Sequence, residues 1–218
     1  MMLDKRLRCA ASMVRPGSRV ADIGTDHAYL PLQLVQAGVC PSAIATDLRP
    51  GPAASARLHA AAAGLEDRIA VRLGDGLSCL APDEADDIVI AGMGGETIAA
   101  ILDAASWVRA PHYHLVLQPM TRPEKLRAYL LTHGFAIREE RVVEDGAHLY
   151  TVMAVAYTGD PPVDDEAAWY RGALGTTGQP FLKKEIQRLH QQEKGHRLAG
   201  HTEEADRLDR LIRQLEES

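Results

Sequence analysis

Apolar and polar positions follow a repeated strand-then-helix rhythm over the first two thirds of the chain. Short apolar runs typical of strands cover residues 19–23, 42–47, 68–73, 87–91 and 113–118. Helical patterns follow at residues 28–37, 52–63, 95–104 and 123–132. Repeated βα units of this kind predict a parallel sheet with helices on both faces.

The rhythm changes after Gly134. Residues 136–144 and 148–157 both favour strands, and Glu-Asp-Gly-Ala at residues 144–147 favours a hairpin turn between them. We therefore expect an antiparallel hairpin to close the parallel sheet. A Gly-Asp-Pro-Pro-Val segment at residues 159–163 predicts a boundary, which divides the chain into domains at 1–158 and 159–218.

The second domain has two helical patterns. Apolar side chains recur at helical spacing at Leu182, Ile186, Leu189, Leu208, Leu211, Ile212 and Leu215. We expect Gly200 to end the first helix and Thr202 to cap the second. The tail from Phe181 carries eight basic and eight acidic residues, so this helical hairpin is either an RNA-gripping element or a packed strut.

Acidic residues and glycines recur where the predicted parallel strands end. Asp22, Asp47, Asp75 and Gly92 each end such a strand. Because ligands of open α/β sheets bind outside the carboxyl ends of the strands, we expect these residues to form one nucleotide site. Asp26 stands where a dinucleotide fingerprint would have its second glycine, so a cationic ligand suits the turn better than a pyrophosphate.

Four segments resemble the motifs of a known family. They are DIGTDHAYLP at 22–31, GDGL at 74–77, IAGMGG at 90–95 and LQP at 117–119, with a fainter match at PFLKKE, 180–185. The set is similar to that of the bacterial TrmK family, which methylates N1 of adenine 22 in tRNA with S-adenosylmethionine. The sequence departs from the family pattern at Met120, where Asn is usual, and at Asp47, where Glu is common.

This resemblance implies a Rossmann-like class I methyltransferase sheet of the α/β class, with the closing hairpin and a small α-helical hairpin behind it. The strand-end positions themselves predict that Asp47 binds ribose hydroxyls, Asp75 an adenine amine and Asp22 water or the ammonium group of the ligand. The full set of expected cofactor-binding residues is Asp22, Gly24, Asp47, Asp75, Gly76, Gly92, Met93 and Gly94. No metal is expected to take part.

Methyl transfer to an adenine ring nitrogen needs alignment more than a strong base, because the nitrogen carries an accessible lone pair. Our candidates for holding the target base are Asp26, His27, Tyr29 and Gln118. Asp26 would accept from the adenine amine and Tyr29 would stack on the base. Each also has a plainer interpretation: a helix cap for Asp26, core packing for His27 and Tyr29, and a strand end for Gln118.

Basic residues are concentrated at the start of the chain, although the net charge is −6. Five basic residues and one acidic residue lie within residues 1–20. The expected phosphate contacts are Lys5, Arg6, Arg8, Arg122, Lys125, Lys183 and Lys184, with Arg127, Arg138 and Arg141 nearby. The alternative is that these are solvated helix faces.

Composition narrows the class of protein further. The chain is 46% apolar, which predicts a globular fold, and it has no run long enough to span a membrane. Cys9, Cys40 and Cys79 form no metal-type pair, so we expect reduced thiols in a cytoplasmic protein. Two alternatives stay open. The protein methylates another RNA or a small molecule, or it binds S-adenosylmethionine or RNA without catalysis.

Overall fold

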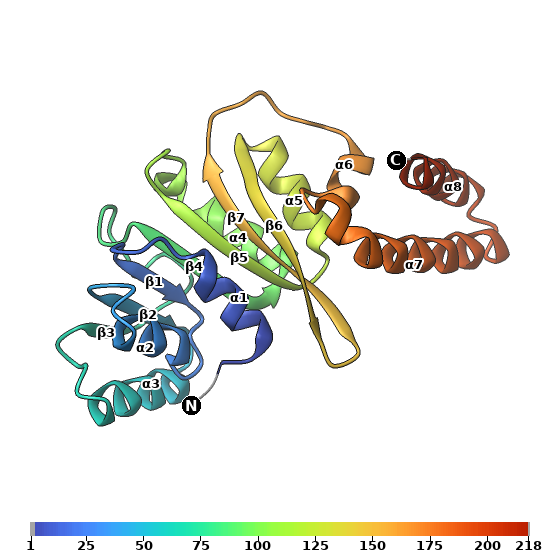
Figure 1. Ribbon diagram of the computed structural model, residues 1–218. Helices are drawn as coiled ribbons and strands as arrows, with labels where there is room; N and C mark the ends of the chain where they lie inside the picture. The colour runs from blue at the N-terminus through green and yellow to red at the C-terminus, as the bar shows by residue number, and fades with distance from the viewer. Residues whose placement is uncertain (1–2, 218) are drawn as a thin grey trace.

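A computed structural model, described for residues 3–217, contains one seven-stranded sheet (Figure 1). The strand order is β3-β2-β1-β4-β5-β7-β6, with β7 antiparallel to both neighbours and the other pairings parallel. The strands are β1 (Val20–Ile23), β2 (Ala43–Asp47), β3 (Ile69–Leu73), β4 (Asp87–Gly94), β5 (His114–Thr121), β6 (Phe135–Asp145) and β7 (His148–Tyr157). The predicted α/β class with its closing hairpin is confirmed.

Helices cover both faces of the sheet. On one face lie α1 (Lys5–Met13), α2 (Tyr29–Gln36) and α3 (Pro50–Ala62), and on the other α4 (Gly95–Ala104) and α5 (Pro123–Thr132). The central strands supply side chains to both apolar cores: Val89 packs with the first group of helices, and Ile88 and Ile90 pack with the second. This explains why residues 88–91 are apolar throughout.

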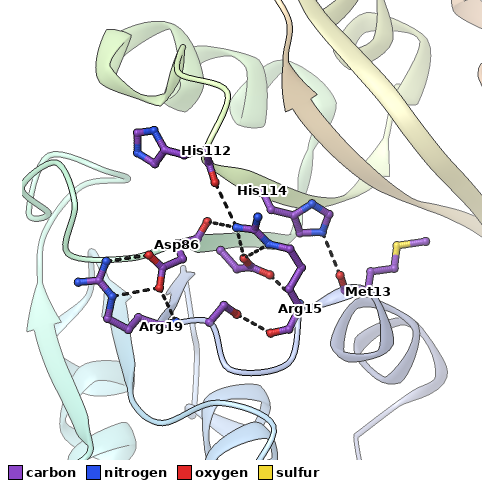
Figure 2. A network of polar contacts seen from close by, with 8 residues as sticks. Met13, Arg15, Arg19, Asp86, His112 and His114 are labelled. Carbon is purple, nitrogen blue, oxygen red and sulfur yellow. Dashed lines mark hydrogen bonds and ion pairs between the residues drawn. The ribbon is translucent and has the colours of Figure 1, made fainter.

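Helix α1, which the hydrophobic pattern did not predict, is fixed at both ends. Asp4 caps its start by accepting from the Leu7 N–H at 2.8 Å. After its end, Arg15 donates from its backbone and its Nε to the buried Asp87 carboxylate, both at 2.7 Å. Figure 2 shows this network, in which His114 also contacts the Met13 carbonyl. Since Asp87 is the first residue of β4, these bonds tie the end of α1 to the amino end of a central strand.

Two strands are longer than expected. The prediction ended them at Ala91 and Gln118, whereas β4 continues to Gly94 and β5 to Thr121. The pairing between them persists because a register shift between Ala91 and Met93 accommodates Gly92, whose φ is +82°. The interpretation of Gln118 as a strand end is therefore wrong.

The C-terminal region contains α6 (Glu166–Arg171), α7 (Gln179–Leu198) and α8 (Thr202–Glu216), and short 3₁₀ turns lie at Ser106–Val108 and Gly175–Gly178. The predicted apolar residues of α7 and α8 pack together with Ala167 and Tyr170 of α6. Thr202 is the first helical residue rather than the cap, and its hydroxyl donates only weakly to the Gly200 carbonyl. The predicted cap is therefore wrong. The predicted end of the first helix before Gly200 is confirmed, with φ +77° there.

Candidate active site

A cleft of about 610 Å³ opens at the carboxyl edge of β1, β2 and β4. Most of the expected cofactor residues line it: Asp22, Gly24, Asp47, Asp75, Gly76, Gly92 and Met93. Gly94 is the exception, because it lies just beyond the cleft as the N-cap of α4. The first turn of α1 completes the wall with Asp4, Arg6 and Leu7.

Asp22 places a carboxyl group at the floor of the cleft. Its carboxylate is buried and accepts from the Thr25 hydroxyl at 2.5 Å. Burial raises the pKa of Asp22 to about 6, opposed by the Thr25 hydrogen bond and reinforced by the nearby Asp47 charge. Within residues 3–217, no basic side chain lies within ion-pair distance of Asp22. A buried carboxylate without a cation fits the ammonium group of S-adenosylmethionine.

Asp47 organises the next strand end. It is buried, and its two carboxylate oxygens accept backbone N–H groups from Arg49 at 2.8 Å and from Asp26 at 3.3 Å. Asp47 therefore ties the β1–α2 loop to the end of β2. A carboxylate held in this way at the cleft wall suits the bidentate binding of ribose hydroxyls.

Two glycines give the cleft its shape. Gly24 has φ +76°, and a Cβ there would lie 2.2 Å from the Met93 Cε. Gly92 lies at the register shift between β4 and β5, and its N–H donates to the Gln118 side chain at 3.0 Å. Any other residue at Gly24 would have to displace the end of the Met93 side chain and would be strained by the positive φ. The glycine and carboxylate pattern thus fits S-adenosylmethionine.

The β1–α2 loop carries the candidate base-holding residues in a strained conformation. Asp26 and Ala28 have φ of 44° and 59°, values that non-glycine residues seldom adopt. The Asp26 side chain is 65% exposed, with His27 Nε2 at 3.6 Å and Arg49 Nη2 at 3.7 Å. Ala28, not Asp26, is the N-cap of α2, and no side chain caps it. The helix-cap interpretation of Asp26 is therefore wrong.

His27 and Tyr29 form an aromatic cluster with His59 of α3. The ring centroids of Tyr29 and His59 are 5.2 Å apart and stacked, and His27 lies 5.2 Å from Tyr29. His59 Nδ1 contacts the His27 carbonyl at 3.0 Å. His27 and Tyr29 line the cleft, so the cluster places aromatic surface at its mouth.

Gln118 does not reach the cleft. It is fully buried, its Oε1 accepts from Gly92 and from Arg6 at 2.8 Å, and its Nε2 donates to the Pro119 carbonyl. Because Gln118 does not line the cleft and its oxygen and nitrogen both already have partners, the structure does not support a contact between Gln118 and the target base. It is a positioning residue for the Gly92 turn and for Arg6.

Sequence reasoning missed several lining residues: Leu48, Arg49, Thr97 and Ile101 of the cleft, and His59 behind it. Leu48 is 63% exposed although it is apolar, and it directly follows Asp47. An apolar residue in that position offers a surface for an adenine ring. Leu48 could have been predicted from the sequence, because it directly follows the strand-end carboxylate of Asp47. The other residues reach the site only through the fold.

The basic residues predicted to contact phosphate differ in exposure and in whether they already have a partner. Lys5, Arg8, Lys125 and Lys183 are exposed, while Arg122 is exposed but paired with Glu96 at 2.8 Å, and Lys184 contacts the Ala147 carbonyl at 3.5 Å. Arg6 is largely enclosed in the cleft wall. Arg127 is buried against Glu140, so the suggestion that it contacts phosphate is wrong.

No helix in residues 3–217 is long and apolar enough to cross a membrane. The same residues contain no group of three or more His, Cys, Asp or Glu side chains arranged to hold a metal ion. All three cysteines are free thiols.

The fold and the cleft are those of a class I methyltransferase. A family model described as a methyltransferase domain matches residues 3–153 of the chain. The sheet order with its antiparallel β7 and the ligand-binding edge formed by β1, β2 and β4 agree with that class.

Closer relatives narrow the family. The chain is 38% identical over 188 residues to the tRNA (adenine(22)-N(1))-methyltransferase of Bacillus subtilis, covering 85% of this chain and 76% of the relative. A crystal structure of a Streptococcus pneumoniae putative tRNA (m1A22) methyltransferase in complex with S-adenosyl-L-methionine superposes with a TM-score of 0.82, at 33% identity and 99% coverage of both chains. The chain belongs to the tRNA (adenine(22)-N(1))-methyltransferase family.

A further solved structure shows that the likeness includes the C-terminal helices. The crystal structure of the B. subtilis M1A22 tRNA methyltransferase TrmK superposes with a TM-score of 0.79, at 31% identity, and the match covers 99% of this chain and 98% of that one. The resemblance inferred from the motifs is therefore confirmed.

Proposed function

We propose that this protein transfers the methyl group of S-adenosylmethionine to N1 of adenine 22 in tRNA. The observation that carries the proposal is a cleft lined by carboxylates and glycines at the carboxyl ends of the strands. The chain that holds it is 38% identical to a tRNA (adenine(22)-N(1))-methyltransferase. S-adenosylmethionine supplies an electrophilic methyl group on a cationic sulfur.

The cofactor contacts in this proposal follow from the side chains of the cleft. Asp47 accepts from the ribose hydroxyls, and Leu48 packs on the adenine ring beside it. Asp22 accepts from the ammonium group, while the turn at Gly24 and Met93 allows close approach. Asp75 is exposed at the cleft rim and is placed to accept from the adenine amine.

The chain's part in catalysis is to align the base and to stabilise positive charge. Adenine N1 needs no deprotonation to attack a methyl group, but the methylated ring is cationic. The Asp26 carboxylate at the cleft mouth offsets that charge and accepts from the exocyclic amine. The cluster of His27, Tyr29 and His59 supplies the aromatic surface beside the base, and exposed cations around the cleft bind phosphates.

The direct test is analysis of nucleosides by mass spectrometry after the protein is incubated with S-adenosylmethionine and an unmodified tRNA transcript. N1-methyladenosine is expected, and it should disappear with a transcript carrying guanine at position 22. Methylation of a different base or position would overturn the proposal, as would tight cofactor binding without any methylation of tRNA.

The same proposal assigns the substrate-binding part of the C-terminal region to α7. Lys183 and Lys184 lie in the first half of α7, near the β6–β7 hairpin. Removing both charges by Lys183→Ala and Lys184→Ala should weaken tRNA binding and leave cofactor binding unchanged.

A further inference from the structure

A second, smaller cavity of about 280 Å³ lies beside the cleft and shares no lining residue with it. It is enclosed by the end of β5, the start of α5, the start of β7 and one face of α7. Arg6 forms the partition between the two spaces. Its guanidinium lies 2.9 Å from the Met120 sulfur and 5.3 Å from the centre of the Tyr150 ring, both of which line the smaller cavity.

Two residues that line this smaller cavity each carry a buried polar atom with no hydrogen-bond partner within residues 3–217. One atom is Glu124 Oε2, in a residue only 7% exposed, and the other is Thr151 Oγ1, in a residue 1% exposed. Buried polar groups are nearly always satisfied, so two unpaired atoms behind the wall of one cavity indicate a ligand that reaches them when it enters. Glu124 lies in the first turn of α5, where the helix dipole favours its negative charge.

The remaining walls narrow the chemistry of that ligand. Tyr150 and Phe181 offer aromatic surface, and Met120 offers a soft apolar one. Arg188 is half-exposed, with its Nη2 3.8 Å from Glu124 Oε1 and 2.8 Å from Glu185, and Arg122 is exposed nearby. An acceptor at the back, aromatic sides and cations at the rim match a flat heterocycle carrying N–H donors and attached to a phosphate backbone.

We propose that the Glu124–Thr151 pocket binds a guanine of the tRNA substrate while the target adenine occupies the main cleft. Guanine presents two adjacent donors, N1–H and the N2 amine, to a carboxylate. Adenine and cytosine pair one donor with an acceptor, and uracil flanks its single donor with two carbonyls, so each of these bases would turn an acceptor toward Glu124. The Thr151 hydroxyl is free to donate to guanine O6 or to accept from its amine. This inference rests on the proposed function, because it takes tRNA as the substrate.

Binding of tRNA without cofactor tests the pocket separately from catalysis. Glu124→Gln keeps the size of the side chain but replaces one acceptor with a donor, and Thr151→Val removes only the hydroxyl. We expect Glu124→Gln to raise the dissociation constant for tRNA about tenfold, the scale of one charge-assisted base contact, with affinity for S-adenosylmethionine unchanged. Glu66→Gln, on an exposed loop far from the pocket, is the matched control.

Inosine substitution identifies the base. Inosine lacks the N2 amine of guanine, so replacing the bound guanine should weaken binding to the wild-type protein by about tenfold and add little for Glu124→Gln. Guanines of the transcript are replaced one at a time, with binding followed by fluorescence anisotropy. The proposal is overturned if every inosine substitution costs the same with both proteins, or if only substitutions of another base are coupled to Glu124.

Folding and function are controlled within the same experiment. Circular dichroism and thermal unfolding identify a variant that fails to fold, and Thr151→Val then carries the test, with a wild-type tRNA affinity for it counting against the pocket. Suppose that one inosine substitution weakens tRNA binding to wild type but not to Glu124→Gln, while wild type forms no N1-methyladenosine. That result would refute the proposed function and leave the guanine pocket standing.

Discussion

Arg127 and Glu140 form a fully buried ion pair that joins the catalytic sheet to the C-terminal helices. Nε and Nη2 of Arg127 donate to Glu140 Oε1 at 3.0 and 2.7 Å. Nη1 of Arg127 donates to the carbonyls of Trp169 and Tyr170 at the end of α6. Gly172 must be a glycine here, because a Cβ would lie 2.3 Å from Glu140 Oε2. The orientation of α6 against α5 thus depends on one salt bridge and the carbonyls it satisfies.

Removing one partner of this pair should strongly destabilise the protein. Arg127→Met leaves the Glu140 charge buried without a cation, so we expect the free energy of unfolding to fall by about 3–5 kcal/mol. Urea unfolding followed by circular dichroism measures the loss. Breaking the exposed Arg213–Asp209 pair with Arg213→Met should cost no more than about 0.5 kcal/mol. Similar losses for the two variants would show that burial does not govern the Arg127 pair.

Cofactor affinity should depend on pH through Asp22. Its pKa is raised from 3.8 to about 6, so the carboxyl group is half neutral near pH 6 and largely neutral about one unit lower, where it cannot balance the ammonium group. We expect affinity for S-adenosylmethionine to rise from pH 5 to pH 7, by up to about tenfold per unit below the pKa. Calorimetric titration measures the affinity, and Asp22→Asn should flatten the profile. The same steep profile in Asp22→Asn would assign the proton to another group.

The free energy of unfolding should change with pH in the opposite direction to the cofactor affinity. Because the folded protein holds the Asp22 proton more tightly than the unfolded chain, the contribution of Asp22 to the free energy of unfolding is largest below about pH 4. That contribution declines as pH rises to about 6. Denaturation of Asp22→Asn without cofactor should lack this decline.

Asp26→Asn should slow methyl transfer while leaving cofactor binding within a few-fold. The Asp26 backbone N–H, not its side chain, contacts Asp47, so the substitution spares the cofactor wall. The exposed carboxylate is available to the base, and its loss should lower the single-turnover rate by about 10²-fold or more. Rapid-quench measurements with saturating tRNA isolate this step. A wild-type rate would remove Asp26 from the catalytic residues.

Arg8 is the clearest test of phosphate binding by α1. It is exposed, whereas Arg6 also supports Gln118 and the partition beside Tyr150. Arg8→Ala should raise the dissociation constant for tRNA and make the slope of log K against log salt shallower by about 0.7–0.9. Anisotropy titrations over a salt series give the slope, with the exposed Arg57→Ala of α3 as the control. Coincident slopes for Arg8→Ala and wild type would mean that Arg8 serves only its hydrogen bond to the Leu3 carbonyl.

The sheet and the cofactor wall could be predicted because their signals are local. An apolar run that ends in Asp22 or Asp47 reports both the strand and the chemistry at its end. The role of Gln118 could not be predicted, because its partners Arg6 and Gly92 are distant in sequence. Arg127 looked like a surface cation for the same reason, since its partner Glu140 lies on a different element.

The placement of α1 decides where an affinity tag can be attached. Asp4 and Arg6 line the cleft, and Arg15 holds the far end of the helix to Asp87. A peptide fused to the amino-terminal end would be joined to the chain three residues before Asp4 of the cleft wall, so we expect it to compete with RNA for that space. The buried side chains of α8 pack with those of α6 and α7, and none of the described residues of α8 lines the cleft, so a tag after α8 should leave the mouth clear. Binding constants measured with amino-terminally tagged protein will understate its affinity for RNA.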